Sequence, residues 1–419
     1  MLNRINSCYL LIVFFLSLAM GIQIIVIPWL ATEYLELSSF YIALVQSAVL
    51  IPNIALLVFG GVSLDKGGLF NKFQGLLLVS SVIHLLFMFL LAQQGLSLFW
   101  VLLYALLLGS INAFVQPYKE YLAGMLATTN LQSHIAKNRI SLYVGQGIGI
   151  GIASQLYQAS LILLPMIQIM ALFLVFICLL LIKRQQNKNL LDVEQIQDKE
   201  KLSYSLLVSG FKVCWGSKIL RSLLTLTAVN GFLHVGVFIV ALPILVKTIY
   251  SGDVELFSFL QGLFTVGMLV SALIIIYLKK LDGPGRRVIF SMLYSGLILL
   301  GLSAGPTVEG LLFLVFLWGV VVGISATLGR SILQSYTDPE YMGRVISIYQ
   351  LTLFGFAPLG ALCAGIAINS LGVLLVLKIS AIMSFIAFAG TFLIKSLWDV
   401  EATDTQLSDA KSTDKKSSE

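Results

Sequence analysis

Charged residues are scarce in this chain of 419 residues, where Asp, Glu, Lys and Arg together make up 11%. Cysteine occurs four times, histidine three times and proline nine times. The few histidines and cysteines are scattered and supply neither a metal-ligand set nor a convergent nucleophile and acid. We therefore expect no metal site, no cofactor and no enzymatic activity. The cysteines fall in apolar or internal segments and imply no disulfide framework.

Hydrophobic residues make up 58% of the chain, and the mean hydropathy of +0.96 lies outside the range of soluble proteins. Runs long enough to cross about 30 Å of hydrocarbon, roughly 20 helical residues each, recur along the whole chain. Their glycines and prolines argue against strands of alternating polarity, so the sequence predicts an all-α polytopic membrane protein with twelve spans. The predicted spans are 8–31, 39–64, 73–92, 98–117, 136–157, 160–182, 222–246, 255–278, 288–304, 309–334, 345–368 and 372–394.

The distribution of basic residues predicts the orientation in the membrane. If the N-terminus is cytoplasmic, all Lys and Arg except Lys247 and Lys378 lie at the cytoplasmic side, as the positive-inside rule requires. We therefore expect both termini in the cytoplasm and a first span that is retained and not cleaved as a signal peptide. The net charge of +6 reflects this topology and gives no reason to expect nucleic acid as a partner.

A long polar insert divides the spans into six and six. We assign residues 1–182 to an N-terminal half, 183–221 to a cytoplasmic linker, 222–395 to a C-terminal half and 396–419 to a tail. Apolar residues at helical spacing within the linker predict a short helix in the membrane interface. The tail has almost no apolar residues and is expected to be disordered.

The two halves carry the same landmarks in the same order, which indicates duplication and two pseudo-symmetric six-helix halves. The pairs are Pro28 and Pro243, 215 positions apart, Asp65 and Asp282, 217 apart, and ISLY at 140–143 and ISIY at 346–349, 206 apart.

One of these landmarks is an acidic, glycine-rich loop. GGVSLDKGGLFNK, residues 60–72, follows the second span, and LDGPGRR, residues 281–287, follows the eighth. Glycine allows a tight turn, and an aspartate at a helix end can hold a basic residue or a helix N-terminus of the adjoining segment. The motif residues are Gly61, Asp65, Lys66 and Gly68 in the first copy and Asp282, Gly285, Arg286 and Arg287 in the second.

Twelve helices in two related halves, with this loop after the second and eighth, resemble the major facilitator superfamily over nearly the whole chain. That family's loop reads Gly-x-x-x-Asp-Arg-x-Gly-Arg-Arg, from which the first copy departs at Leu69 and Phe70 and the second at Leu278. The resemblance implies secondary active transport by alternating access, in which the loop latches the halves together on the cytoplasmic side in the outward-facing state. The alternative is a tight turn that serves only topology.

A narrower resemblance lies in the second half. The stretch Gln334 to Gly365, with GFKVCWGSKILRSLL before the seventh span, is similar to the subgroup of the enterobactin exporter and the macrolide efflux proteins. It implies proton-coupled export of an amphipathic small molecule, a drug or a siderophore, across a bacterial inner membrane, and we expect a monomer. Uptake of a nutrient or iron-siderophore by the same fold is the alternative, and a membrane enzyme or sensor is a remote one.

Proton coupling requires an ionisable group inside the membrane. Two residues are candidates: Glu120, which lies beside Lys119 near the end of the fourth span, and His234, in the middle of the seventh. The alternatives are that Glu120 and Lys119 only end their helix at the interface, and that His234 is a hydrogen-bonded structural residue.

Polar side chains within apolar spans are candidates for contact with the substrate between the halves. The glycines of GQGIGIGIAS, residues 145–154, are better explained by close helix packing than by phosphate binding, because no strand precedes them. The substrate-contact candidates are Lys119, Asn230, Gln23, Gln46, Asn53 and Arg330.

Overall fold

The structure is a computed structural model, and it describes residues 2–65, 68–126, 131–186, 204–278, 283–338, 341–393 and 395–400. At some helix ends, including 57–65 and 124–126, only the backbone is described. All regular elements in these ranges are helices, as expected where hydrocarbon offers the backbone no other hydrogen-bond partners.

The first half contains α1 (Leu2–Trp29), α2 (Ser39–Asp65), α3 (Leu69–Ala92), α4 (Leu98–Leu126), α5 (Leu131–Ala159) and α6 (Leu163–Gln186). The second half contains α8 (Lys218–Asn230), α9 (Gly236–Thr248), α10 (Val254–Leu278), α11 (Pro284–Ser303), α12 (Val308–Ser335), α13 (Met342–Leu371) and α14 (Val373–Gly390). A short helix, α7 (Tyr204–Gly216), lies between them in the sequence.

Twelve of these units have the length of a membrane span, because a π-helical turn at Gly231–Val235 joins α8 and α9 into one. In the described part of the chain, ten are also apolar enough to cross a membrane by composition. The other two are α2, apolar over Ser39–Pro52, and α5, a helix of 29 residues with a polar beginning. The predicted all-α, twelve-helix fold is confirmed.

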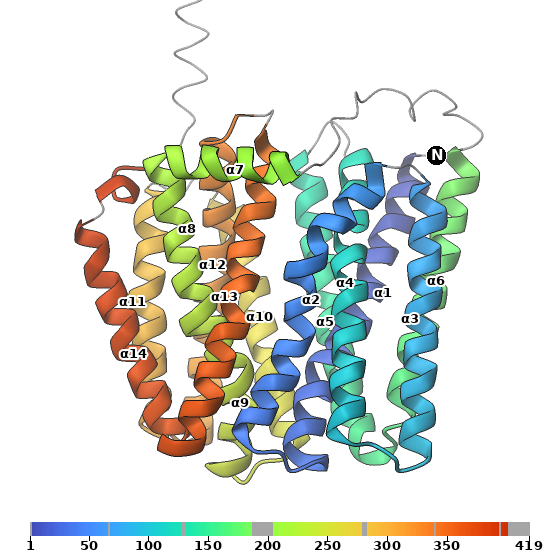
Figure 1. Cartoon of the computed structure of the whole chain (residues 1–419), viewed down its shortest axis with the longest axis horizontal. Coiled ribbons are helices and arrows are strands. Elements are labelled where there is room, and N and C mark those ends of the chain that lie inside the picture. The colour runs from blue at the N-terminus through green and yellow to red at the C-terminus, as the bar shows by residue number, and fades with distance from the viewer. Residues whose placement is uncertain are drawn as a thin grey trace, which may run out of the picture.

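Figure 1 shows the two halves side by side, the first on the right and the second on the left. Helix α7 lies across one end of the bundle, and the N-terminus lies at that same end. We call this end the α7 end and the opposite end the far end. The halves meet chiefly where α2 contacts α13 and where α5 contacts α10.

The buried apolar residues are organised differently at the two ends. At the far end, one continuous core contains residues of both halves, among them Ile25 and Trp29 of α1 and Val240 of α9. At the α7 end, the described residues form two separate cores. One lies within the first half around Tyr9 and Tyr118, and the other lies within the second half and includes α11 and α13 residues. The two halves are therefore packed together at the far end.

Glycines of α5 set the close approach to α1. A side chain at Gly145 would collide with the backbone of Phe14, and one at Gly149 with the backbone of Leu18. Gly147 and Gly151 have open space instead. Two of the four predicted packing glycines therefore form the contact, as expected for residues four apart on one helix face.

Several predicted boundaries need correction. Helix α4 does not end near residue 117 but continues to Leu126, so Lys119 and Glu120 lie within the helix and not at its end. Residues 396–400, expected to be part of a disordered tail, are packed: Leu397 and Val400 are buried, and Ser396 lies 2.8 Å from the hydroxyl of Ser222 in α8. The rest of the tail lies outside the described residues.

Candidate functional site

The two loop motifs form matching turns at the α7 end. Gly68 precedes α3 with φ of 75°, and Gly283 precedes α11 with φ of 59°. This left-handed conformation is costly for other residues, which explains the glycine in each copy. The two positions are 215 apart, the same interval that separates Pro28 and Pro243. Each turn therefore starts the third helix of its half.

The remaining motif residues divide into those the structure places and those it does not. Gly61 and Asp65 lie in the last turns of α2, where only the backbone is described, and Lys66 and Asp282 lie outside the described residues. The predicted latch between the halves therefore stays a prediction.

The second copy contacts the end of its own chain. The Arg286 guanidinium donates from Nε to the backbone oxygen of Trp398 at 2.9 Å. Gly285 lies so close to the backbone of Leu397 that a side chain would not fit there. Arg287 follows in the first turn of α11 and is exposed. The second copy of the motif thus anchors residues 395–400 against α11.

Glu120 lies in α4, towards the α7 end of the bundle, and is hydrogen-bonded to a residue of each half. Gln116, one turn earlier on α4, donates to Glu120 Oε1 at 2.9 Å. Gln350 of α13, in the second half, donates to the same oxygen at 3.4 Å. Among the acidic residues of the described spans, only Glu120 lies more than one turn from a helix end. Its carboxylate is therefore an ionisable group at the contact between the halves.

Lys119 and Tyr9 of the first half interact electrostatically with this carboxylate, and Arg139 interacts with Lys119. Lys119 is half-buried and interacts electrostatically with Glu120 and with Arg139 of α5. Tyr9 of α1 accepts a hydrogen bond from Asn138 of α5 at 3.0 Å. Together with Gln116 and Gln350, these residues form what we call the Glu120 cluster. It combines two cations with one acid, so it suits a ligand that carries a negative group.

The second half places a cation at a comparable depth. Arg330 of α12 is half-buried, five residues before the helix ends. The Tyr349 side chain interacts electrostatically with Arg330. Its hydroxyl lies against Gly329, where a side chain would displace it. Tyr349 is followed directly by Gln350, so α13 connects this group to the Glu120 cluster.

His234 is held within the second half. It is 2% exposed, its Nδ1 lies 2.8 Å from the Asn230 amide oxygen, and its Nε2 lies 3.1 Å from the Ser384 hydroxyl. Ser384 in turn donates to the backbone oxygen of Met292 at 2.8 Å, so it accepts from the histidine. The imidazolium can donate to both neighbours, whereas the neutral ring needs the Asn230 amide turned over. These contacts join α8, α11 and α14.

The remaining candidates lie apart from both groups. Gln46 of α2 donates to the backbone oxygen of Ile239 in α9 at 3.3 Å, a contact between the halves. Gln23 is half-buried in α1, and Asn53 belongs to α2, where its side chain is not described. His84 is buried in α3 with Nδ1 2.7 Å from the backbone oxygen of Ser80.

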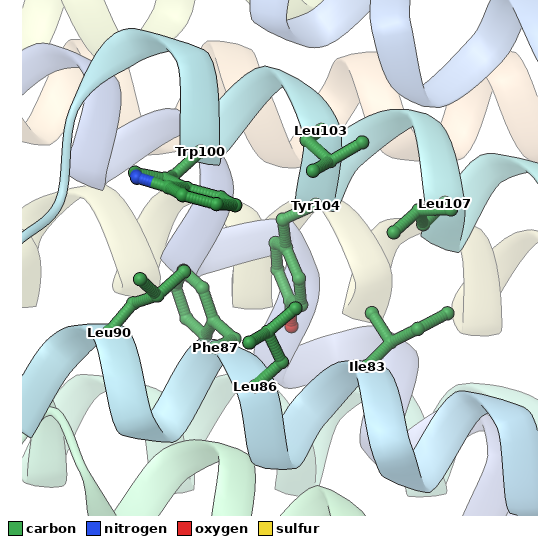
Figure 2. Close-up of a pocket in the computed structure, with 8 residues that line it drawn as sticks. All are labelled: Ile83, Leu86, Phe87, Leu90, Trp100, Leu103, Tyr104 and Leu107. Carbon is green, nitrogen blue, oxygen red and sulfur yellow. The ribbon is translucent and has the colours of Figure 1, made fainter.

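Figure 2 shows an apolar groove between α3 and α4, on a different part of the first half. Phe87 and Tyr104 stack within it at 4.0 Å between ring centroids. Tyr104 precedes Glu120 by 16 residues, about 24 Å along a helix. None of the residues that line this groove is charged, so the groove suits a lipid chain and is not part of the Glu120 cluster. The lining residues are Ile83, Leu86, Phe87, Leu90, Trp100, Leu103, Tyr104 and Leu107.

Comparisons with known proteins agree with this architecture. The profile of the Major Facilitator Superfamily matches residues 9–355, and again 224–418. The chain belongs to this superfamily. None of the curated proteins matches the sequence.

Solved structures of the superfamily fold are similar over almost their full length. The nucleoside transporter NupG has a TM-score of 0.71 at 13% identity, covering 94% of this chain and 99% of that one. The human organic anion transporter MFSD10 has a TM-score of 0.64 at 15% identity, covering 94% and 99%. A bacterial homologue of the human lysosomal transporter Spinster, in an inward-facing and unoccupied conformation, has 0.69 at 12%, covering 95% and 97%. At such identities the likeness shows the fold alone.

Several residues of the Glu120 cluster were not predicted from the sequence. Gln116 could have been recognised, because it precedes Glu120 by one helical turn. Gln350 directly follows ISIY, whereas Val144 directly follows ISLY in the first half. Comparison of the two repeats therefore singles out Gln350 as a polar residue at a position that is apolar in the other half. Tyr9, Asn138 and Arg139 carried no signal beyond being polar in or near apolar spans.

Proposed function

We propose that the chain is a proton-coupled secondary transporter that exports an amphipathic small molecule across a bacterial inner membrane and works as a monomer. Its superfamily is one of membrane transporters. The export direction, the proton and the class of substrate, a drug or a siderophore, are supported by the resemblance of Gln334 to Gly365 to the enterobactin and macrolide exporters.

The observation that carries the proposal is the position of Glu120. Its Oε1 accepts from Gln116 on its own helix and from Gln350 across the contact between the halves. Hydrogen bonds to an ionised carboxylate are stronger than those to a neutral one. Protonation would therefore weaken the contact between α4 and α13, which is how a proton could bias the relative position of the two halves.

The orientation follows from the basic residues. With both termini in the cytoplasm, the α7 end is cytoplasmic and the far end external. The shared core at the far end and the separate cores at the α7 end then fit a transporter that is closed to the outside. In this state the Glu120 cluster is on the side from which an exporter takes its substrate.

The substrate most compatible with the Glu120 cluster carries a negative group on an apolar body. Lys119 and Arg139 in the first half and Arg330 in the second outnumber the single acid among them. A carboxylate or catecholate substrate would neutralise this excess positive charge, while the gain or loss of a proton at Glu120 would bias the relative position of the two halves.

Everted membrane vesicles with an acidified interior test this proposal. Addition of a substrate from a panel of amphipathic anions, cations and siderophores is expected to dissipate the pH gradient only in vesicles that contain the protein. Accumulation of a compound without any loss of the gradient would contradict proton coupling. Movement of the compound with the protons, out of the vesicles, would favour uptake over export.

A further inference from the structure

Helix α7 presents exposed aromatic side chains, and exposed basic residues of α7 and of the start of α8 lie near them in the sequence. The Phe211 and Trp215 side chains are 51% and 56% exposed. They lie one turn apart and stack, with 5.4 Å between ring centroids and 19° between planes. Large aromatic side chains exposed at the end of a membrane bundle are typical of residues at the level of lipid headgroups.

The opposite face of α7 fixes these aromatic residues in place. Cys214 is fully buried in the core of the second half, and burial raises the pKa of its thiol to about 11. Gly210 lies against the Arg344 and Ile348 side chains of α13, where a side chain would collide with both. Figure 1 shows α7 lying across the ends of the spans. The aromatic pair is thus held by packing.

Basic residues flank this pair in the sequence. Lys212, Lys218 and Arg221 are all exposed, and the Arg221 guanidinium lies 5.9 Å from the Trp215 ring centroid. Between residues 204 and 221 the sequence contains no acid. Among the described residues, these three cations form no ion pair with an acid, which favours an anionic partner over a basic one.

We propose that this surface, formed by Phe211, Lys212, Trp215, Lys218 and Arg221, is a binding site for the headgroup of an anionic phospholipid. The aromatic pair lies at the headgroup level, and the three cations contact the phosphate. Because Gly210 packs on α13, the bound lipid anchors the end of the helix that carries Gln350. The site is independent of the transported substrate.

Trp215 itself reports the contact. The full-length protein is reconstituted into nanodiscs of phosphatidylcholine that contain a fixed fraction of dibrominated phosphatidylglycerol or dibrominated phosphatidylcholine. The difference in fluorescence between the parent and Trp215→Phe isolates the signal of Trp215. We expect stronger quenching by the brominated phosphatidylglycerol, with a preference that falls about fivefold for each of Lys212→Gln, Lys218→Gln and Arg221→Gln, as roughly 1 kcal/mol per basic residue implies.

Lys378→Gln is the matched control, since it removes one positive charge from an exposed position of α14 far from α7. It should leave the preference unchanged. Equal quenching of Trp215 by the two lipids in the parent would overturn the proposal, as would a preference that survives all three single substitutions. Lack of any quenching would show that α7 does not lie in the membrane interface and would overturn it as well.

Discussion

Glu120 is the residue on which proton coupling depends in this account, because it is ionisable and is bonded from both halves. A single oxygen of its carboxylate accepts from Gln116 and Gln350. The residue therefore has two separable properties, a proton that it can gain or lose and a contact that it makes with α13. Two substitutions distinguish them.

Glu120→Gln removes the titration and keeps a side chain that can accept a hydrogen bond. We expect proton-coupled transport to fall at least about tenfold, as is common when a group that transfers protons is lost, and the remaining transport to be independent of pH. Gln350→Met is the matched control, because it removes the contact between the halves but keeps the acid. It should change the rate and retain the pH dependence, both measured in everted vesicles. A pH profile of Glu120→Gln identical to that of the parent would remove this residue from the mechanism.

His234 is expected to contribute to stability more than to coupling, since both ring nitrogens are bonded within the second half. His234→Ala removes the partner of the Asn230 amide and one of the two hydrogen bonds of Ser384, which keeps its bond to Met292, at a cost of about 1–3 kcal/mol. The purified protein should therefore unfold at a lower temperature, and Ser384→Ala should lower it in the same direction. Unchanged unfolding together with loss of proton coupling would instead make His234 the proton carrier.

At the scale of elements, the order and type of the helices could be predicted from apolar length alone, since a span has few alternatives in hydrocarbon. Their ends could not. Helix α4 continues past Pro117 to Leu126, and Glu120 beyond the proline accepts hydrogen bonds from Gln116 of α4 and Gln350 of α13. The π-helical turn at Gly231–Val235 and the packing of residues 395–400 on α11 depend on contacts distant in sequence, and no local pattern marks them.

The contact of α1 with α5 gives a test at this scale with a matched pair of glycines. Gly149→Ala places a methyl group against the backbone of Leu18, which must shift, at a cost of about 1–3 kcal/mol for overpacking. Gly147→Ala has open space and should be neutral or stabilising by up to about 1 kcal/mol through helix propensity. The yield and unfolding temperature of the two purified variants check this. Equal behaviour would mean that the glycines do not set this contact.

At the scale of the whole molecule, transport requires the far end to open. Several contacts between the halves must then break, including the ion pair of Glu33 with Lys247 and the stack of Trp29 on Phe257 at 5.3 Å. The ion pair is exposed and therefore contributes little, about 0–1 kcal/mol. The apolar core at the far end is the larger barrier, and the polar contacts at the α7 end must compensate for its loss.

Lys247→Glu puts like charges together at the far end and should increase the population in which that end is open. The double substitution Glu33→Lys with Lys247→Glu restores opposite charges and should reverse the effect. Distances between spin labels at Ser38 and Ser370 measure the opening directly. Both positions are exposed at the far end, Ser38 in the first half and Ser370 in the second. Identical distance distributions in all three proteins would show that the ion pair does not influence the equilibrium.

The central claim, export of a small molecule, is tested most directly by untargeted mass spectrometry of cytosol and spent medium. A strain that lacks the protein is compared with its parent and with a strain that carries Glu120→Gln, under iron-replete and iron-starved growth. We predict a compound that is retained in the cytosol and missing from the medium in both altered strains. A compound that instead remains unconsumed in their medium would contradict export and make the protein an importer.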